Sequence, residues 1–491
     1  MADFCSAVDM RGVKILKSAY SQQYVFARLT PKDIDQLVEI DLKTHKDADS
    51  VKGPAVDRAI YKIWMDHKVQ TNTSRSVCTV KADAARIAFD TRGQGIVWAV
   101  LDTGVDGAHP HFATHETLKL TAPLHHIDFT TLDSVDAAPT APMLADKTPS
   151  EGEAAQEKSA AAVKAGGKDN AALIDIAGHG THVAGIIAGE YRPGPAEREV
   201  EGRVEKLTRI VNTRFANFRE DQSTANVDEQ SETLVMAGMA PLAKIISLKV
   251  LADNDAGDAS NIIAALEHIQ WINGYGRHIL IHGVNLSIGY GFDPAWFACG
   301  QSPLCVEVNR TVASGAVVVV AAGNTGYGQN ITKMRGPRAA GLDITINDPG
   351  NAEDAITVGS THRDMPHVYG VSYFSSKGPT GDGRMKPDLV APGERIQSCA
   401  SSDVNNARLS SGVDKDGRPV EIAQYVEMSG TSMAAPHVSG VIAAFLSKRR
   451  EFIGRPLKTK EIFLSSAVDL GRERYFQGHG LVDLMGAIRD V

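Results

Sequence analysis

Three short segments of the chain carry residue types that together can perform nucleophilic catalysis. Ser432 lies in a polar turn that runs directly into an apolar, small-residue segment, which predicts a buried helix. A serine at a helix N-terminus lies beside free backbone N–H groups that can stabilise a negatively charged oxygen. Asp102 ends an apolar run, and His179 opens a second apolar helix between two glycines. A serine hydroxyl becomes a nucleophile when a histidine takes its proton and a carboxylate orients that histidine.

The order of these residues along the chain, acid then histidine then serine, resembles that of the subtilisin-like serine proteases, the subtilases. The resemblance extends from about Val80 to the C-terminus. The motifs are Asp102-Thr103-Gly104, Gly178-His179-Gly180-Thr181-His182 and Gly430-Thr431-Ser432-Met433-Ala434-Ala435-Pro436. The resemblance implies that Asp102, His179 and Ser432 form the catalytic triad of a serine endopeptidase, which cleaves proteins and peptides through an acyl-enzyme intermediate. Ser432 alone would be interpreted as an ordinary helix cap.

A further segment resembles the part of a subtilase that binds the oxyanion. Asn324 follows the apolar run Val320-Ala321-Ala322-Gly323. The resemblance implies that the Asn324 side-chain amide and the Ser432 backbone N–H are the two donors. The alternative is a turn asparagine in Gly-Asn-Thr-Gly, a sequence typical of turns.

The resemblance also implies where the substrate backbone binds. Ser287, Ile288 and Gly289 resemble the strand end that pairs with the peptide and walls the specificity pocket, and Ala256-Gly257 is the candidate for the opposite strand. A peptide would bind between them as an added strand. Because main-chain pairing accepts many sequences, we expect broad specificity with an apolar or neutral preference.

Several buried strands are predicted from apolar runs that do not alternate with polar residues, which is typical of a parallel sheet covered on both faces. The runs are 96–101, 245–250, 284–288 and 316–322. Residues 261–272 have helical spacing. We expect an α/β, subtilisin-like three-layer fold with a mainly parallel central sheet between helices, plus a small α+β N-terminal region. The active site of such a sheet lies at the carboxyl ends of its strands.

Residues 1–75 precede the part of the chain that resembles subtilases. A strand is predicted at 24–29, a helix at 31–40 and a second strand at 60–64. In position and size this region resembles a subtilase pro-domain, and a cleavage would then fall between Val69 and Lys81. The alternative is an N-terminal extension that stays attached.

Residues 76–491 are the predicted catalytic domain, with insertions at about 113–177 and 191–233. The first insertion contains a polar, alanine-rich stretch, 134–170, that predicts a solvated surface segment. The second predicts an amphipathic helix. Its apolar positions are Val200, Val204, Leu207, Val211, Phe215 and Phe218. Terminal helices are predicted within 459–470 and 480–491.

Composition excludes several classes of protein. The net charge is −8 and there is no long basic block, so we expect no nucleic-acid or anionic-membrane partner. No apolar run reaches the ~20 residues of a membrane span. No secretory signal follows Met1, which indicates a cytoplasmic protein if Met1 is the natural start, and secretion by another route stays open. The odd count of five cysteines does not indicate a disulfide framework.

The motifs predict no metal ion or cofactor for the chemistry. His182, three residues after His179, is predicted to be structural, because no third ligand with zinc spacing accompanies the pair. Subtilases often have His-Pro-Asp where this chain has His109-Pro110-His111, and histidine nitrogen is a poor calcium ligand. Other structural calcium sites stay unassigned. Cys299 and Cys305 are predicted to be free thiols or a local disulfide.

Two alternatives to an endopeptidase remain. One is a non-catalytic or self-inhibited member of the family that binds peptides. The other is an exopeptidase-type trimmer in which the insertions close one end of the cleft. The sequence indicates neither the physiological substrate nor an oligomeric state.

Overall fold

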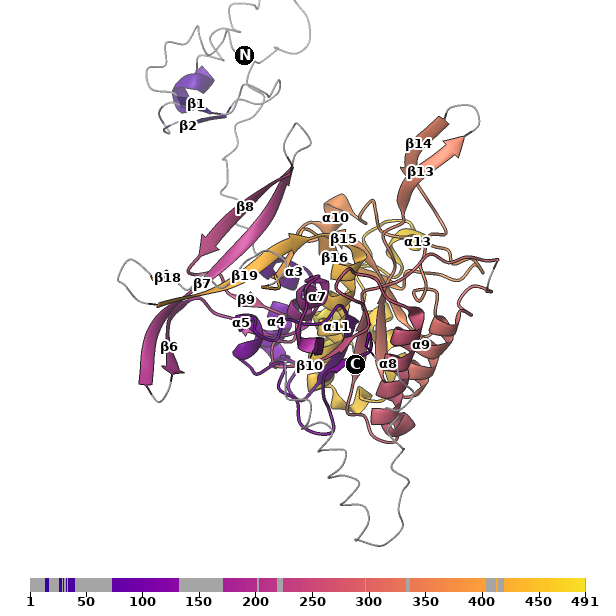
Figure 1. Cartoon of the computed structure of the whole chain (residues 1–491). Coiled ribbons are helices and arrows are strands. Elements are labelled where there is room, and N and C mark those ends of the chain that lie inside the picture. Colours follow the sequence, from indigo (N-terminus) through magenta and orange to yellow (C-terminus); the bar gives the residue numbers. More distant parts are fainter. Residues whose placement is uncertain are drawn as a thin grey trace, which may run out of the picture. The chain divides into compact units, whose positions relative to one another are not determined.

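The computed structural model describes residues 14–16, 26–28, 30, 32, 34–39, 73–131, 171–200, 203–218, 224–295, 297–332, 336–402, 412–413 and 419–490 of the chain. The chain divides into two compact units, residues 1–71 and 72–491, and each is described by itself (Figure 1).

The first unit contains a short antiparallel pair of strands. Strand β1 (Lys14–Leu16) pairs with β2 (Phe26–Arg28), and residues 34–39 are helical. Strand β2 and the helix lie within the predicted segments 24–29 and 31–40. The predicted strand at 60–64 lies outside the described residues. The pro-domain role and the cleavage between Val69 and Lys81 stay predictions.

The second unit is built on a seven-stranded sheet in which every neighbouring pair is parallel. In spatial order the strands are β16 (Leu389–Glu394), β15 (Ile356–His362), β12 (Val317–Ala321), β11 (Gly283–Leu286), β3 (Val97–Asp102), β10 (Lys244–Lys249) and β4 (Ile127–Asp128). Four of these strands coincide with the predicted apolar runs.

Helices cover both faces of this sheet, and the side chains of each strand alternate between them. In β3, Trp98 and Val100 pack into one core cluster, while Ala99 and Leu101 pack into the other. The first layer contains α4 (Ala82–Phe89), α7 (His179–Ile187), α11 (Thr431–Lys448), α12 (Pro456–Ser465) and α14 (Leu484–Arg489), and the second contains α8 (Ala259–Ile272) and α9 (Pro303–Ala313). The predicted three-layer α/β fold is confirmed. The apolar runs identified its strands because a strand buried on both faces needs apolar residues at every position.

A second sheet extends from the α7 side of the molecule (Figure 1). Its main path is β17 (Ile396–Cys399), β19 (Pro419–Met428), β7 (Arg203–Phe218) and β6 (Gly194–Val200), with β18 (Gly412–Val413) on β19 and β8 (Thr224–Ser231) on β7. Most of it comes from the insertion at 191–233. Residues 134–170 of the other insertion lie outside the described residues.

The prediction of an amphipathic helix in the second insertion is wrong. Val200 is the last residue of β6, and the other five apolar positions lie in β7. The apolar spacing was ambiguous: Leu207, Val211 and Phe215 lie four residues apart, which suits one face of a helix and also one face of a strand. β-Branched residues are frequent in β7, among them Thr208 and Ile210, and they favour strands.

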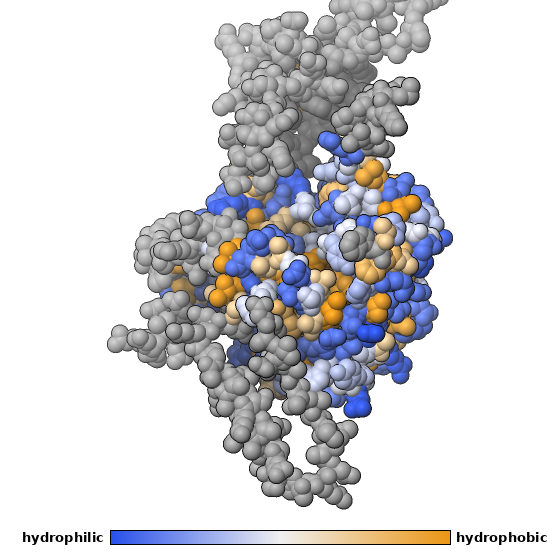
Figure 2. Space-filling model, turned by 45° about the vertical axis from the view of Figure 1, so that its right-hand side comes forward, coloured by the Kyte–Doolittle hydropathy of each residue, from blue (hydrophilic) through white to orange (hydrophobic). Residues whose placement is uncertain are grey.

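The remaining elements are short. They are α3 (Thr73–Thr79), α5 (Pro110–Ala113), η3 (Ala171–Leu173), β5 (Glu190–Tyr191), β9 (Met236–Ala237), η4 (Gly274–Gly276), β13 (Tyr327–Thr332), β14 (Gly336–Gly341), α10 (Pro366–Tyr369), η5 (Arg450–Phe452) and α13 (Arg474–Gln477). None of the helices in the described part of the chain has the length and apolarity that crossing a bilayer requires. On the face shown in Figure 2, apolar residues form small patches among polar ones.

Three consecutive residues of β19 bind three buried histidines of the core. His109 Nε2 lies 2.7 Å from the Gln424 carbonyl oxygen, His111 Nδ1 lies 3.0 Å from the Tyr425 hydroxyl, and His182 Nε2 lies 3.1 Å from the Val426 carbonyl oxygen. Burial lowers the pKa of His111 and of His182 to about 3, and it also lowers the pKa of His109. The second sheet is therefore attached to the core by neutral imidazoles.

These histidines predict a loss of stability in acid. The unfolded chain takes up protons below the ordinary histidine pKa of 6.5, whereas the folded protein resists protonation until about 3. The free energy of unfolding should therefore fall as the pH drops below 6.5, by about 1.4 kcal/mol per pH unit for each such histidine. Changing His111 to Gln should reduce this slope by about that amount, measured by urea unfolding across this pH range. The exposed His367, changed to Gln in the same way, is the control, and an unaltered slope in H111Q would contradict the account.

Candidate active site

The site lies at the carboxyl edge of the central sheet, where β3 and β11 end side by side. Leu101 of β3 pairs with Leu286 of β11. The residues that follow this pair, Asp102 and Ser287, are therefore also neighbours. Val100 faces the layer that contains α7 and α11, and the alternation of a strand places the Asp102 side chain on that same face.

Asp102 binds the first residue of α7. The Asp102 carboxylate is buried, and its Oδ1 atom lies 2.7 Å from His179 Nδ1 and accepts a hydrogen bond from the Thr103 backbone N–H. This contact fixes the proton on Nδ1, so that the free lone pair of the neutral ring lies on Nε2. The two segments approach closely because Gly180 has no side chain: a Cβ there would lie 2.1 Å from the Gly104 carbonyl oxygen.

The surroundings of His179 favour its protonated form. Burial is the largest single effect and lowers the pKa of the imidazole. The charge of Asp102, the hydrogen bond to it and the charges of Asp255 and Asp175 together outweigh burial and raise the pKa to about 9. The imidazole stays accessible, with 25% of the side chain exposed. It can therefore exchange protons with a bound molecule or with solvent.

Ser432 is in the first turn of α11 and is tied to the end of β11 by two hydrogen bonds. The Ser432 hydroxyl donates to the Ser287 carbonyl oxygen at 2.8 Å, and the Ser287 hydroxyl donates to the Ser432 carbonyl oxygen at 2.9 Å. The second bond depends on Pro436, which has no N–H to offer the carbonyl four residues earlier. The structure gives no hydrogen bond between Ser432 and His179, although their partners, Ser287 and Asp102, lie at the ends of neighbouring strands.

Asn324 follows β12 and lies against the start of α11. Its Oδ1 atom accepts hydrogen bonds from the Thr431 backbone N–H at 2.9 Å and from the Thr431 hydroxyl at 3.0 Å. A Cβ on Gly430 would lie 3.3 Å from Asn324 Nδ2 and 3.7 Å from the Ser432 backbone nitrogen. The acceptor side of the amide is therefore occupied, and its donor side lies beside the backbone that leads to Ser432.

The predicted substrate-binding residues are placed in two segments. Ser287, Ile288 and Gly289 continue from β11, and a Cβ on Gly289 would lie 2.7 Å from the Asp348 carbonyl oxygen, so this segment runs close to a neighbouring loop. Gly257 lies in the turn after β10, where a Cβ would lie 2.6 Å from the Val250 carbonyl oxygen. Among the described residues no hydrogen bond joins the two segments, and the binding of a peptide between them stays a prediction.

Comparison with known proteins identifies the family. A model of the subtilase family matches residues 93–481, which is most of the chain. The chain belongs to the subtilase family. The matched range includes all three predicted triad residues and Asn324.

Individual subtilases are similar over shorter stretches. Pyrolysin of Pyrococcus furiosus is 31% identical over 335 residues, which are 62% of this chain and 21% of pyrolysin. The serine protease AprX of Bacillus subtilis is 30% identical over 58% of this chain and 61% of AprX, and subtilisin DY of Bacillus licheniformis is 27% identical over 52% of this chain and 72% of that protein. The chain thus spans about a fifth of pyrolysin and three fifths of AprX.

Several polar residues of this subtilase contribute to the site in ways that the sequence did not predict. Asp175, Thr103 and Lys249 are buried beside Asp102 and the start of α7. Asp175 stands four residues before His179, outside the N-cap position, which is Gly178, so the pattern of a helix cap does not identify it. Lys249 follows an apolar run, and nothing in its spacing distinguishes it from a surface lysine.

The other candidate ligands of the subtilase are occupied by protein contacts. His182 Nε2 lies 3.1 Å from both the Ile396 and the Val426 carbonyl oxygens, which supports a structural role. Cys299 and Cys305 are free thiols. Within the described part of the chain, no group of three or more His, Cys, Asp or Glu side chains is arranged to bind a metal ion.

The His109-Pro110-His111 turn does not fit calcium. His111 Nε2 lies 3.1 Å from the Ala188 carbonyl oxygen, and both rings are buried with their nitrogens directed at protein partners. Calcium requires six to eight oxygen ligands, and this turn presents imidazoles instead.

The contact between Asp102 and His179 predicts the basicity of the imidazole. The pKa of His179, followed by NMR titration of its ring protons, should lie above the ordinary 6.5 and approach about 9. Changing Asp102 to Asn removes the charge that causes the rise, so the pKa should fall in that variant. Assignment of the resonance by its loss in H179Q is the control. A pKa of 6.5 or lower in the unmodified protein would contradict the geometry.

Proposed function

We propose that this subtilase is a serine endopeptidase that hydrolyses peptide bonds of proteins with Ser432, His179 and Asp102. The observation that supports this most is the 2.7 Å contact between Asp102 and His179 at the strand end beside Ser287, which in turn binds Ser432. The names of the similar proteins, which include a serine protease and a subtilisin, agree with the proposal.

In the proposed reaction, Ser432 Oγ attacks the carbonyl carbon of the scissile bond. His179 Nε2 takes the hydroxyl proton and returns it to the leaving amine, and water then hydrolyses the acyl-enzyme by the same route. Asp102 keeps the proton on Nδ1 and stabilises the imidazolium. For the first step the hydroxyl exchanges its bond to the Ser287 carbonyl for one to His179.

The proposed oxyanion site uses the start of α11. The Asn324 side-chain N–H and the Ser432 backbone N–H are the two donors, since Thr431 occupies the other end of the Asn324 amide. Donors that are fixed before the reaction stabilise the developing charge without reorganisation. Pairing of the substrate backbone with Ser287–Gly289 is the proposed basis of binding.

One observation favours a second candidate function, a protein that binds peptides without turnover. The Ser432 hydroxyl donates to the Ser287 carbonyl and not to His179. A hydroxyl that stays in this bond would not be deprotonated. Labelling with a fluorophosphonate separates the two candidates, because the probe reacts with an activated serine and not with an inert one.

Ser432→Ala should abolish turnover and leave the fold intact. We expect the unmodified protein to be labelled by a fluorophosphonate at Ser432 and to degrade an unfolded protein substrate, and the variant to lose roughly 10⁶-fold in kcat. Mass spectrometry of the products distinguishes internal cuts, which identify an endopeptidase, from stepwise trimming at one end.

The matched control for this variant is Ser429→Ala. Ser429 is exposed, three residues earlier, and its hydroxyl accepts a hydrogen bond from the Arg395 backbone N–H. Equal degradation by the unmodified protein and S432A would contradict the proposed nucleophile. Absence of both labelling and degradation in the unmodified protein would favour the peptide-binding function.

Asn324→Ala should lower kcat by roughly 10²–10³-fold with little change in KM, because the lost donor acts on the transition state. Asn324→Asp retains the acceptor for Thr431 and replaces the donor by a negatively charged oxygen, so it should lower kcat at least as much as Asn324→Ala while it keeps the support of the helix. Steady-state kinetics with a peptide substrate measure both variants. A normal kcat in N324D would exclude the side-chain amide as an oxyanion donor.

A further inference from the structure

A buried carboxylate that the proposed reaction does not use lies behind the pair of Asp102 and His179. Asp175 is completely buried, and both of its oxygens are occupied. Oδ1 accepts hydrogen bonds from the Thr103 hydroxyl and the Gly178 backbone N–H, each at 2.8 Å. Oδ2 accepts from the Thr181 backbone N–H at 2.7 Å and from the Thr181 hydroxyl at 2.5 Å.

These four bonds join the two segments that carry the acid and the imidazole. Thr103 directly follows Asp102, whereas Gly178 and Thr181 flank His179 in the first turn of α7. A single side chain thus spans from the end of β3 to the start of the helix.

The two threonine hydroxyls extend the connection. Because each donates its proton to Asp175, its oxygen is left to accept: Thr103 Oγ1 accepts from the Gly180 backbone N–H at 3.0 Å, and Thr181 Oγ1 accepts from the Asp106 backbone N–H at 2.9 Å. Both of these bonds also cross between the two segments. The carboxylate therefore sets the direction of a network of hydrogen bonds that surrounds the contact between Asp102 and His179.

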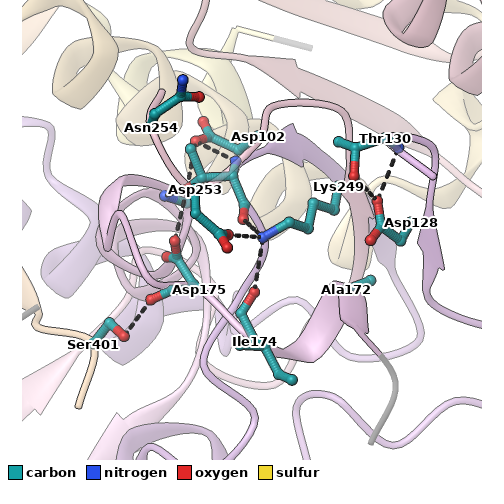
Figure 3. A network of polar contacts seen from close by, with 12 residues as sticks. Asp102, Asp128, Thr130, Ala172, Ile174, Asp175, Lys249, Asp253, Asn254 and Ser401 are labelled. Atoms are coloured by element: carbon teal, nitrogen blue, oxygen red, sulfur yellow. Dashed lines mark hydrogen bonds and ion pairs between the residues drawn. The ribbon is translucent and has the colours of Figure 1, made fainter. Parts of the chain in front are cut away.

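Lys249 holds the same segments from the other side (Figure 3). Its Nζ atom donates to the Thr103 carbonyl oxygen at 2.8 Å, to the Ile174 carbonyl oxygen at 3.2 Å and to Asp253 Oδ1 at 2.6 Å. Thr103 is thus bound through its hydroxyl and through its carbonyl. The residue before Asp175 is fixed by the same ammonium group, which leaves the carboxylate little freedom to shift.

We propose that Asp175 is a positioning residue that sets the distance and orientation of the His179 imidazole relative to Asp102 by binding Thr103 and the first turn of α7 at once. The inference rests on the proposed function. It assigns Asp175 no contact with substrate: its effect passes through the two segments that it joins.

The role requires a carboxylate. A backbone N–H donates to each of the two oxygens of Asp175, so an amide in its place would direct its own N–H₂ group at the N–H of Gly178 or at that of Thr181. Asp175→Asn would therefore lose one of these two backbone bonds, with almost no change in volume, even where a threonine hydroxyl rotates to accept from the amide. It would also remove one of the negative charges that raise the pKa of His179.

The test is a kinetic comparison of Asp175→Asn with the unmodified protein, expressed per active site titrated with a fluorophosphonate. Misplacement of reacting groups by about 1 Å can cost roughly 10²-fold, so we expect kcat to fall by up to that factor while KM changes little. The midpoint of the rise of kcat/KM with pH should move to lower pH, because less negative charge then favours the imidazolium. A residue with only a structural role would alter the number of titratable sites and leave the kcat per site and the pH midpoint unchanged.

Asp483→Asn is the matched control. Asp483 is also buried, caps α14 through the Gly486 backbone N–H at 3.0 Å and forms an ion pair with Lys81, and neither partner belongs to the proposed site. We expect its kcat per titrated site to equal that of the unmodified protein. If D175N and D483N both retain normal kcat per site, the inference is overturned.

A second pair of variants decides the question if D175N does not fold. Thr103→Val removes the hydroxyl that binds Asp175 and keeps the shape of the side chain, whereas Thr103→Ser keeps the hydroxyl. A lower kcat in T103V, restored in T103S, supports the inference, and equal kcat in the two contradicts it. Failure of the proposed function looks different: the unmodified protein itself would then be neither labelled nor active.

Discussion

The parallel pairing of β3 with β11 is the constraint on which the site depends. Its register places the residues after Leu101 and Leu286 next to each other, and each of these two residues binds another member of the proposed active site. Asp102 binds His179, and Ser287 binds Ser432. A shift of one residue in either strand would turn its side chains to the opposite face, and the carboxylate would then face α8 and α9 instead of α7.

Close packing of α11 on the sheet is the second requirement. The helix is rich in small residues, and β11 and its end present polar residues to it: Asn285 accepts a hydrogen bond from Ser439, and Ser287 binds Ser432. Each of these contacts needs the backbones to be near one another. The small residues of α11 therefore permit the serine to reach the end of the strand.

The sequence predicted those elements of the fold whose hydrophobic pattern fits only one type of secondary structure. Continuous apolar runs identified the core strands, because only strands covered on both faces are apolar throughout. Strand β7 was mistaken for a helix since spacings of four residues fit both structures, and its pairing with β19, some 200 positions later, could not be deduced locally. The three triad residues were found through their motifs. Asp175 and Lys249 were not, because their importance comes from which backbone groups the fold brings to them.

A crystal structure of the chain with a peptidyl boronic acid tests the central claim most directly, since boron forms a reversible bond with an activated serine and imitates the tetrahedral intermediate. The account predicts a bond from boron to Ser432 Oγ, a boronate oxygen within hydrogen-bond distance of Asn324 Nδ2, His179 Nε2 directed at the same centre, and the peptide backbone beside Ser287–Gly289. A boronate bound elsewhere, or a Ser432 hydroxyl still bonded to the Ser287 carbonyl with the inhibitor present, would contradict it.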